Sequence, residues 1–143
     1  ILSKLGFVVD ENLRKKLNTA KDKMDIVLTV SDTEIILVEC KSVKESGYNK
    51  FSSVSRQLKS YMSLAEKNNV KVIKSLLIAP EFSDDFVKDC GLDYELNLSL
   101  ITAHSLSKIL EAFKTSKHQS LPYNLLMRDV LIQEDRIIKA IGK

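Results

Sequence analysis

The order of apolar and polar positions predicts a hairpin in the first third of the chain. Apolar residues fill most of 26–30 and all of 35–38, and the polar stretch 31–34 separates them. Short runs rich in β-branched residues, divided by a turn-like polar stretch, are typical of paired strands. We therefore predict two antiparallel strands within 25–41.

A helical pattern follows the hairpin. Apolar residues recur every three or four positions from Phe51 to Ala65, which predicts an amphipathic helix over 51–67. Strands are then predicted at 70–79 and 96–102, and helices at 83–90 and 105–114. We expect Gly91 to end the helix at 83–90.

The two ends of the chain give weaker patterns. We predict a helix end at 1–5 that stops at Gly6, a short strand at 7–9, and one or two closing helices within 121–141. The polar stretch 10–23 predicts no more than one helical turn, around Leu13. The whole order predicts one domain of the α/β (α+β) class, in which helices flank a mixed central β-sheet.

Composition excludes several classes of protein. The 143 residues are 44% hydrophobic and carry a net charge of +3, which is too small for a strongly basic nucleic-acid binder. No apolar run is long enough for a transmembrane helix. His104 and His118 lack the spacing of a zinc site, and the four glycines form no phosphate-binding loop.

The cysteines predict a cellular compartment, and the first residue predicts that the chain is part of a longer protein. Two cysteines make no disulfide framework, so we expect Cys40 and Cys90 to be reduced residues of the core, as in a cytoplasmic protein. The chain begins with Ile1 in what the pattern predicts to be a helix end. We therefore expect a C-terminal fragment of a longer protein.

Charged residues at the outer ends of the hairpin are the candidate site. Asp25 enters the first strand, and Glu39 and Lys41 leave the second, on the same side of the strand and opposite Cys40. Two carboxylates hold Mg²⁺ well, and the backbone carbonyl of Cys40 is a further candidate ligand. An ammonium beside them orients a water molecule and stabilises developing negative charge. A salt-bridge cluster at the strand ends is the alternative interpretation.

These residues resemble the PD-(D/E)xK nuclease superfamily. Asp25, thirteen further residues and then Glu39-Cys40-Lys41 match its motif, and the succession of elements from about Leu5 to Phe113 is similar to the FokI-type cleavage domain of type IIS restriction endonucleases. The similarity includes the loop 46–49 with Tyr48. The chain departs from the pattern at Met24, where the family often has proline, and at Glu39, where it often has aspartate.

The resemblance implies a restriction-endonuclease-like core and a Mg²⁺-dependent endonuclease acting on double-stranded DNA, with Mn²⁺ as a substitute. It implies that Asp25 and Glu39 bind the metal, that Lys41 positions the water, and that the DNA-recognition domain is missing from this fragment. Cleavage of both strands would need a homodimer or a partner subunit. The alternatives are another nuclease of this superfamily (repair, junction-resolving or transposition) and an inactive domain that binds DNA or protein.

Other polar residues have two interpretations each. Gln57 either supports the active site or is an ordinary helix residue. Tyr48 either contacts DNA or packs in its loop. Basic residues before the hairpin form either a solvated loop or a phosphate-contacting surface. The basic candidates for DNA contact are Lys15, Lys16, Lys21 and Lys23.

Overall fold

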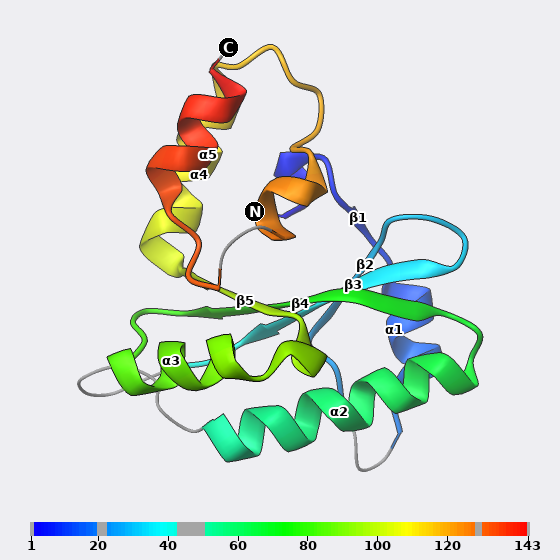
Figure 1. Ribbon diagram of the computed structural model, residues 1–143. Helices are drawn as coiled ribbons and strands as arrows, with labels where there is room; N and C mark the ends of the chain where they lie inside the picture. The colour runs from blue at the N-terminus through cyan, green and yellow to red at the C-terminus, as the bar shows by residue number, and fades with distance from the viewer. Residues whose placement is uncertain (1, 20–22, 43–50, 128–129, 143) are drawn as a thin grey trace.

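A five-stranded mixed sheet forms the centre of the molecule (Figure 1). The computed structural model describes residues 2–19, 23–42, 51–127 and 130–142. The strands lie in the order of the sequence, β1 (Val8–Val9), β2 (Ile26–Thr29), β3 (Glu34–Cys40), β4 (Lys71–Ala79) and β5 (Leu98–Thr102). Strands β1, β2 and β3 pair antiparallel, and β3, β4 and β5 pair parallel.

Helices cover both faces of the sheet (Figure 1). One face packs against α1 (Glu11–Leu17), α2 (Phe51–Lys67) and α3 (Asp84–Leu92). The other packs against α4 (Ala103–Lys114) and α5 (Glu134–Ile141), together with the 3-10 helices η1 (Ser3–Leu5) and η3 (Tyr123–Met127). A third 3-10 helix, η2 (Tyr94–Leu96), leads into β5.

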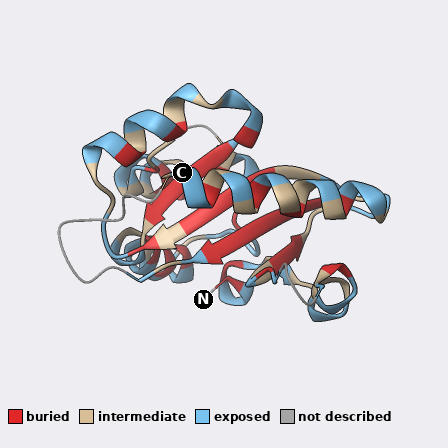
Figure 2. Ribbon diagram, turned by 90° about the horizontal axis from the view of Figure 1, so that it is seen from below, coloured by how far each residue is buried: buried red, intermediate tan, exposed pale blue. Residues whose placement is uncertain are grey.

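The alternation of side chains along β3 assigns each residue to one of the two cores. Ile35 and Leu37 belong to the core under α2, and Ile36 and Val38 to the core under α4. Both faces are therefore buried (Figure 2), which explains the uninterrupted apolar run in the sequence. Glu39 continues the series on the α2 face, where its burial is a cost that needs compensation.

The predicted fold class is confirmed at the level of a mixed sheet flanked by helices. The hairpin is also confirmed, with β3 starting one residue before the predicted apolar run, and α2 spans the predicted range 51–67. Gly6 ends the first helical turn as predicted. Its φ of 90° is left-handed, and an added Cβ would lie 2.4 Å from Cβ of Ser120.

Two predictions about helices are wrong. The stretch 10–23 contains a complete helix, α1, because the Asp10 carboxylate caps it by accepting from the backbone N–H of Leu13 at 2.9 Å. Leu13 and Leu17 lie one turn apart on its inner side, and the surrounding charges hid this pair in the sequence. Gly91 does not end α3, which continues to Leu92.

Smaller differences concern the starts of the last elements. Helix α4 begins at Ala103, since the Thr102 hydroxyl accepts from the backbone N–H of Ser105 at 3.1 Å and caps it. Leu96 belongs to η2 and not to the strand. The predicted closing helices are η3 and α5. None of the helices in the described ranges has the length and apolar character needed to span a membrane.

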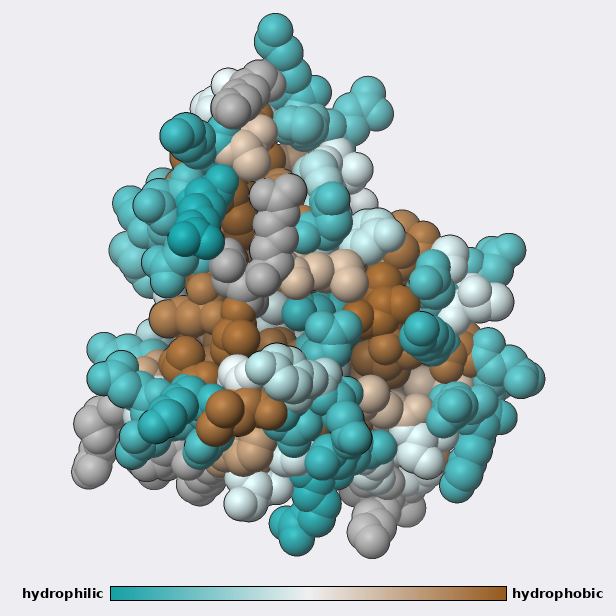
Figure 3. Space-filling model, in the orientation of Figure 1, coloured by the Kyte–Doolittle hydropathy of each residue, from teal (hydrophilic) through white to brown (hydrophobic). Residues whose placement is uncertain are grey.

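The outer surfaces of the helices are mostly hydrophilic. Figure 3 shows hydrophobic residues reaching this face mainly at the level of the sheet. Few large hydrophobic side chains are exposed among the described residues. They are Val8, Leu92, Tyr94 and Tyr123.

Candidate active site

Asp25 and Glu39 face each other at the open end of the hairpin. Ile26 pairs with Val38, so the antiparallel register places Asp25 opposite Glu39. The backbone N–H of Asp25 donates to Glu39 Oε1 at 3.1 Å, and the backbone N–H of Cys40 donates to Asp25 Oδ2 at 2.9 Å. Each strand thus holds the carboxylate of the other.

Lys41 and Gln57 complete this group from the α2 side. The backbone N–H of Lys41 donates to the Ile78 carbonyl at 2.8 Å, which continues the β3–β4 ladder. Its Nζ donates to Gln57 Oε1 at 3.1 Å. Helix α2 therefore fixes the ammonium on the same face of the sheet as Glu39. We call Asp25, Glu39, Lys41 and Gln57 the hairpin corner.

The two carboxylates of the hairpin corner differ in burial. Asp25 is exposed, whereas only 3% of the Glu39 surface is exposed. Burial is the largest of the causes that raise the pKa of Glu39 to about 8, and the charge of Asp25 contributes to this rise. The hydrogen bond from the Asp25 backbone and the charge of Lys41 lower this pKa, but they do not cancel the burial. The charge of Lys41 alone therefore does not offset the burial of the Glu39 carboxylate.

A divalent cation bound between Asp25 and Glu39 would favour the charged form of both carboxylates. The described residues contain no group of three or more His, Cys, Asp and Glu side chains able to hold a metal. Mg²⁺ does not require one, because it commonly binds through one or two carboxylates and keeps several water molecules. The two carboxylates of the hairpin corner fit that donor set.

The predicted place of Cys40 in the core is wrong. Cys40 does lie on the face opposite Glu39, as the alternation predicts, but its side chain is exposed. Being the last residue of β3, it lies at the sheet end and lines an open apolar pocket of about 380 Å³ with Ile78 and Leu106. Cys90 is buried as predicted, and neither cysteine forms a disulfide.

The sequence did not indicate which residues hold the segment before Asp25. The Asn18 side chain accepts from the backbone N–H of Met24 at 2.8 Å and donates to its carbonyl at 3.4 Å. The Tyr61 hydroxyl donates to the Lys23 carbonyl at 2.5 Å. Tyr61 is buried, as its place in the apolar stripe predicts, but its hydroxyl also fixes the entry to the hairpin corner. The role of Asn18 had no signal, because its partner is a backbone group.

The basic residues before the hairpin lie in different places. Lys15 and Lys23 are exposed. Lys16 lines a polar hollow of about 660 Å³ with Asp32 of the hairpin turn, at the end of the hairpin opposite Asp25. Lys21, Tyr48 and the rest of the loop 46–49 lie outside the described residues.

Arg14 belongs to the same basic stretch before the hairpin, and its charge interacts with that of Asp25. Its guanidinium bonds Glu11 Oε2 at 2.7 Å, and this contact raises the pKa of Arg14. Burial opposes that rise, and the charges of Glu11 and Asp25 add to it. Arg14 therefore lies within electrostatic range of the hairpin corner.

Comparison with protein-family models, curated proteins and solved structures finds no match to this chain. Inferences about its function therefore depend on the hairpin corner and its surroundings.

Proposed function

We propose that this chain is a metal-dependent endodeoxyribonuclease domain that hydrolyses phosphodiester bonds in double-stranded DNA. The observation that carries the proposal is the hairpin corner. Two carboxylates face each other through reciprocal backbone hydrogen bonds, and an ammonium held by Gln57 lies on the same face. These are the groups that phosphodiester hydrolysis needs: a cation site and a fixed positive charge beside it.

Each residue of the corner has a distinct role in this proposal. Asp25 and Glu39 would hold Mg²⁺ or Mn²⁺, with the backbone carbonyl of Cys40 as a further ligand. A cation held there would supply the charge that lowers the pKa of a water molecule and neutralises the phosphate. Lys41 orients the attacking water and stabilises negative charge that develops on the phosphate oxygens. Gln57 keeps the Lys41 ammonium in place, because its Oε1 accepts a hydrogen bond from Nζ at 3.1 Å.

The resemblance to the PD-(D/E)xK superfamily supports this proposal. The order hairpin, helix, strand, helix, strand is compatible with a restriction-endonuclease-like core. We propose that the domain is the cleavage module of a type IIS-like restriction enzyme, and that a separate domain recognises the DNA sequence. The exposed Lys15 and Lys23 would contact the phosphates, and cleavage of both strands would use a homodimer or a partner subunit.

A plasmid-cleavage assay tests the proposed function. Wild-type protein with Mg²⁺ should convert supercoiled plasmid to open-circular or linear DNA, and chelation with EDTA should stop it. Lys41→Ala should lose this activity, whereas Lys59→Ala, which removes an exposed lysine of α2, should retain it. Equal cleavage by wild type and Lys41→Ala would refute the mechanism.

A further inference from the structure

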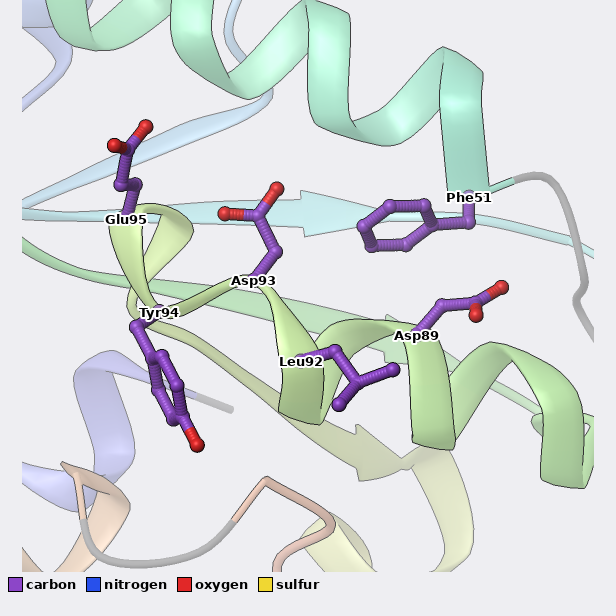
Figure 4. Close-up of a pocket in the computed structure, with 6 residues that line it drawn as sticks. All are labelled: Phe51, Asp89, Leu92, Asp93, Tyr94 and Glu95. Carbon is purple, nitrogen blue, oxygen red and sulfur yellow. The ribbon is translucent and has the colours of Figure 1, made fainter.

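A second group of carboxylates lies on the α2 face of the sheet, between the start of α2 and the end of α3 (Figure 4). It borders an open hollow of about 540 Å³. We call this hollow the acidic hollow. Its lining residues are Phe51, Asp89, Leu92, Asp93, Tyr94 and Glu95.

Exposed apolar side chains border the acidic hollow. Leu92 is 67% exposed and Tyr94 is 87% exposed, the two highest values among the large hydrophobic residues in the described ranges. Because both side chains line the acidic hollow, these two exposed apolar residues lie on one small surface. Figure 4 shows Phe51 projecting toward Asp93 on the α2 side, while Tyr94 extends from the other edge. Exposed apolar side chains that gather at one place mark interaction sites.

The charge of the acidic hollow is unbalanced. Asp93 forms an ion pair with Lys59 at 3.5 Å. The side chains of Asp89 and Glu95 form no hydrogen bond or ion pair with another residue in the described part of the chain. This negative surface contrasts with the net charge of +3 of the chain.

We propose that the acidic hollow is a docking site for a basic segment of another protein, in which lysines or arginines flank an apolar side chain. The apolar side chain would cover Leu92 and Tyr94, and the cations would pair with Asp89 and Glu95. The negative charge disfavours DNA, since phosphates would be repelled. An open hollow of about 540 Å³ suits a few side chains of a short peptide segment.

A second copy of this chain fits the acidic hollow less well. The exposed Lys15 and Lys16 of α1 would be a complementary surface. None of the described residues of α1, however, has an exposed large apolar side chain to cover Leu92 and Tyr94. Such a contact joins two different surfaces and does not close into a symmetric dimer. The partner is therefore a different polypeptide.

Titration with a defined peptide tests this proposal. The probe is a short capped peptide with lysines and arginines around a leucine and a phenylalanine. One matched peptide has glutamates for the basic residues, and another has serines for the apolar ones. Amide chemical shifts of the whole chain report where each peptide binds. We expect saturable shifts at Phe51 and at 89–95 with the first peptide, and much weaker binding of the other two.

Surface variants make the test specific. Asp89→Lys and Glu95→Lys should each weaken binding about tenfold, and Leu92→Ser by a similar factor. Glu66→Lys, which reverses an exposed carboxylate elsewhere on α2, and Val8→Ser, which removes an exposed apolar side chain on β1, should not change it. Binding that is unchanged in Asp89→Lys, Glu95→Lys and Leu92→Ser would overturn the proposal. Shifts centred on residues 25 and 39–41 would overturn it as well. So would self-association of the chain that Leu92→Ser abolishes, since it would assign the acidic hollow to a second copy.

Discussion

The hairpin corner and the acidic hollow both bring carboxylates close together, yet their surroundings differ. In the corner, Glu39 is almost fully buried, and each carboxylate accepts a hydrogen bond from the backbone of the facing strand. In the hollow, Asp89 and Glu95 are exposed beside exposed apolar side chains. Burial with fixed partners suits a small cation, and exposure with apolar neighbours suits a macromolecule. The environment of the carboxylates, and not their number, therefore distinguishes the two regions.

The largest expected difference between the two regions is in DNA cleavage. Glu39→Ala should reduce Mg²⁺-dependent plasmid cleavage by about 10³-fold, because it removes a proposed metal ligand. Asp89→Ala, the matched change in the acidic hollow, should leave the rate unchanged. Initial rates at saturating Mg²⁺ measure both. A similar loss in the two variants would contradict the separation of the regions.

The next largest effect concerns stability against pH. The pKa of Glu39 is about 8 in the folded protein and 4.5 as the ordinary value, so the folded state binds this proton more tightly. Without metal, the stabilisation from this proton is complete below pH 4.5 and is lost as pH rises to about 8. In Glu39→Gln the side chain at position 39 is neutral at every pH. The unfolding free energy of this variant should therefore exceed that of wild type by on the order of 3 kcal/mol at pH 8.

Urea unfolding at pH 5 and pH 8 measures this difference. The advantage of Glu39→Gln over wild type should be small at pH 5 and larger at pH 8. Glu95→Gln is the control in the acidic hollow and should show no such dependence, because its carboxylate is exposed. A difference between Glu39→Gln and wild type that does not change with pH would show that Glu39 is not buried as described.

A smaller effect is expected from the residue that holds the segment before Asp25. Asn18→Ala leaves the backbone N–H of Met24 without its partner, so the unfolding free energy should fall by about 1–2 kcal/mol. Cleavage should also slow, because Asp25 directly follows Met24. Asn12→Ala, a change at an exposed position of the preceding helix α1, is the control for both measurements. Cleavage at the wild-type rate by Asn18→Ala would separate this residue from the hairpin corner.

The smallest effect is expected at the ion pair of the acidic hollow. Lys59 and Asp93 are 51% and 23% exposed and lie 3.5 Å apart. Exposed pairs contribute little, so Lys59→Ala should change the unfolding free energy by about 0.5 kcal/mol or less. Thermal or urea unfolding measures it. A loss several times larger would show that this pair is structurally important.

The sequence predicted the parts of the fold that depend on periodicity. Two short apolar runs around a polar turn predicted the hairpin, and the stripe from Phe51 to Ala65 predicted α2 with its observed bounds. Helix α1 was missed, since its cap and its short apolar pair are weak signals among charges. The prediction that Gly91 ends α3 is wrong, since the helix includes this glycine and ends at Leu92.

The candidate site was predictable only in part. Strand alternation and the hairpin predicted that Asp25, Glu39 and Lys41 would lie near one another, and the geometry agrees. The contact of Gln57 with Lys41 was one of two open alternatives. The roles of Asn18 and of the Tyr61 hydroxyl depend on backbone groups far along the chain, which no local pattern reveals. The exposure of Cys40 depends on where the helices stop covering the sheet.

Calorimetric titration with Mn²⁺ tests most directly whether the hairpin corner, and not the acidic hollow, is a divalent-cation site. Wild type and Asp89→Ala should bind the ion with the same affinity at one site. Asp25→Ala should lose this binding, since only the Glu39 carboxylate remains. Equal binding by wild type and Asp25→Ala, or a loss of binding in Asp89→Ala, would contradict the assignment of the metal to the hairpin corner.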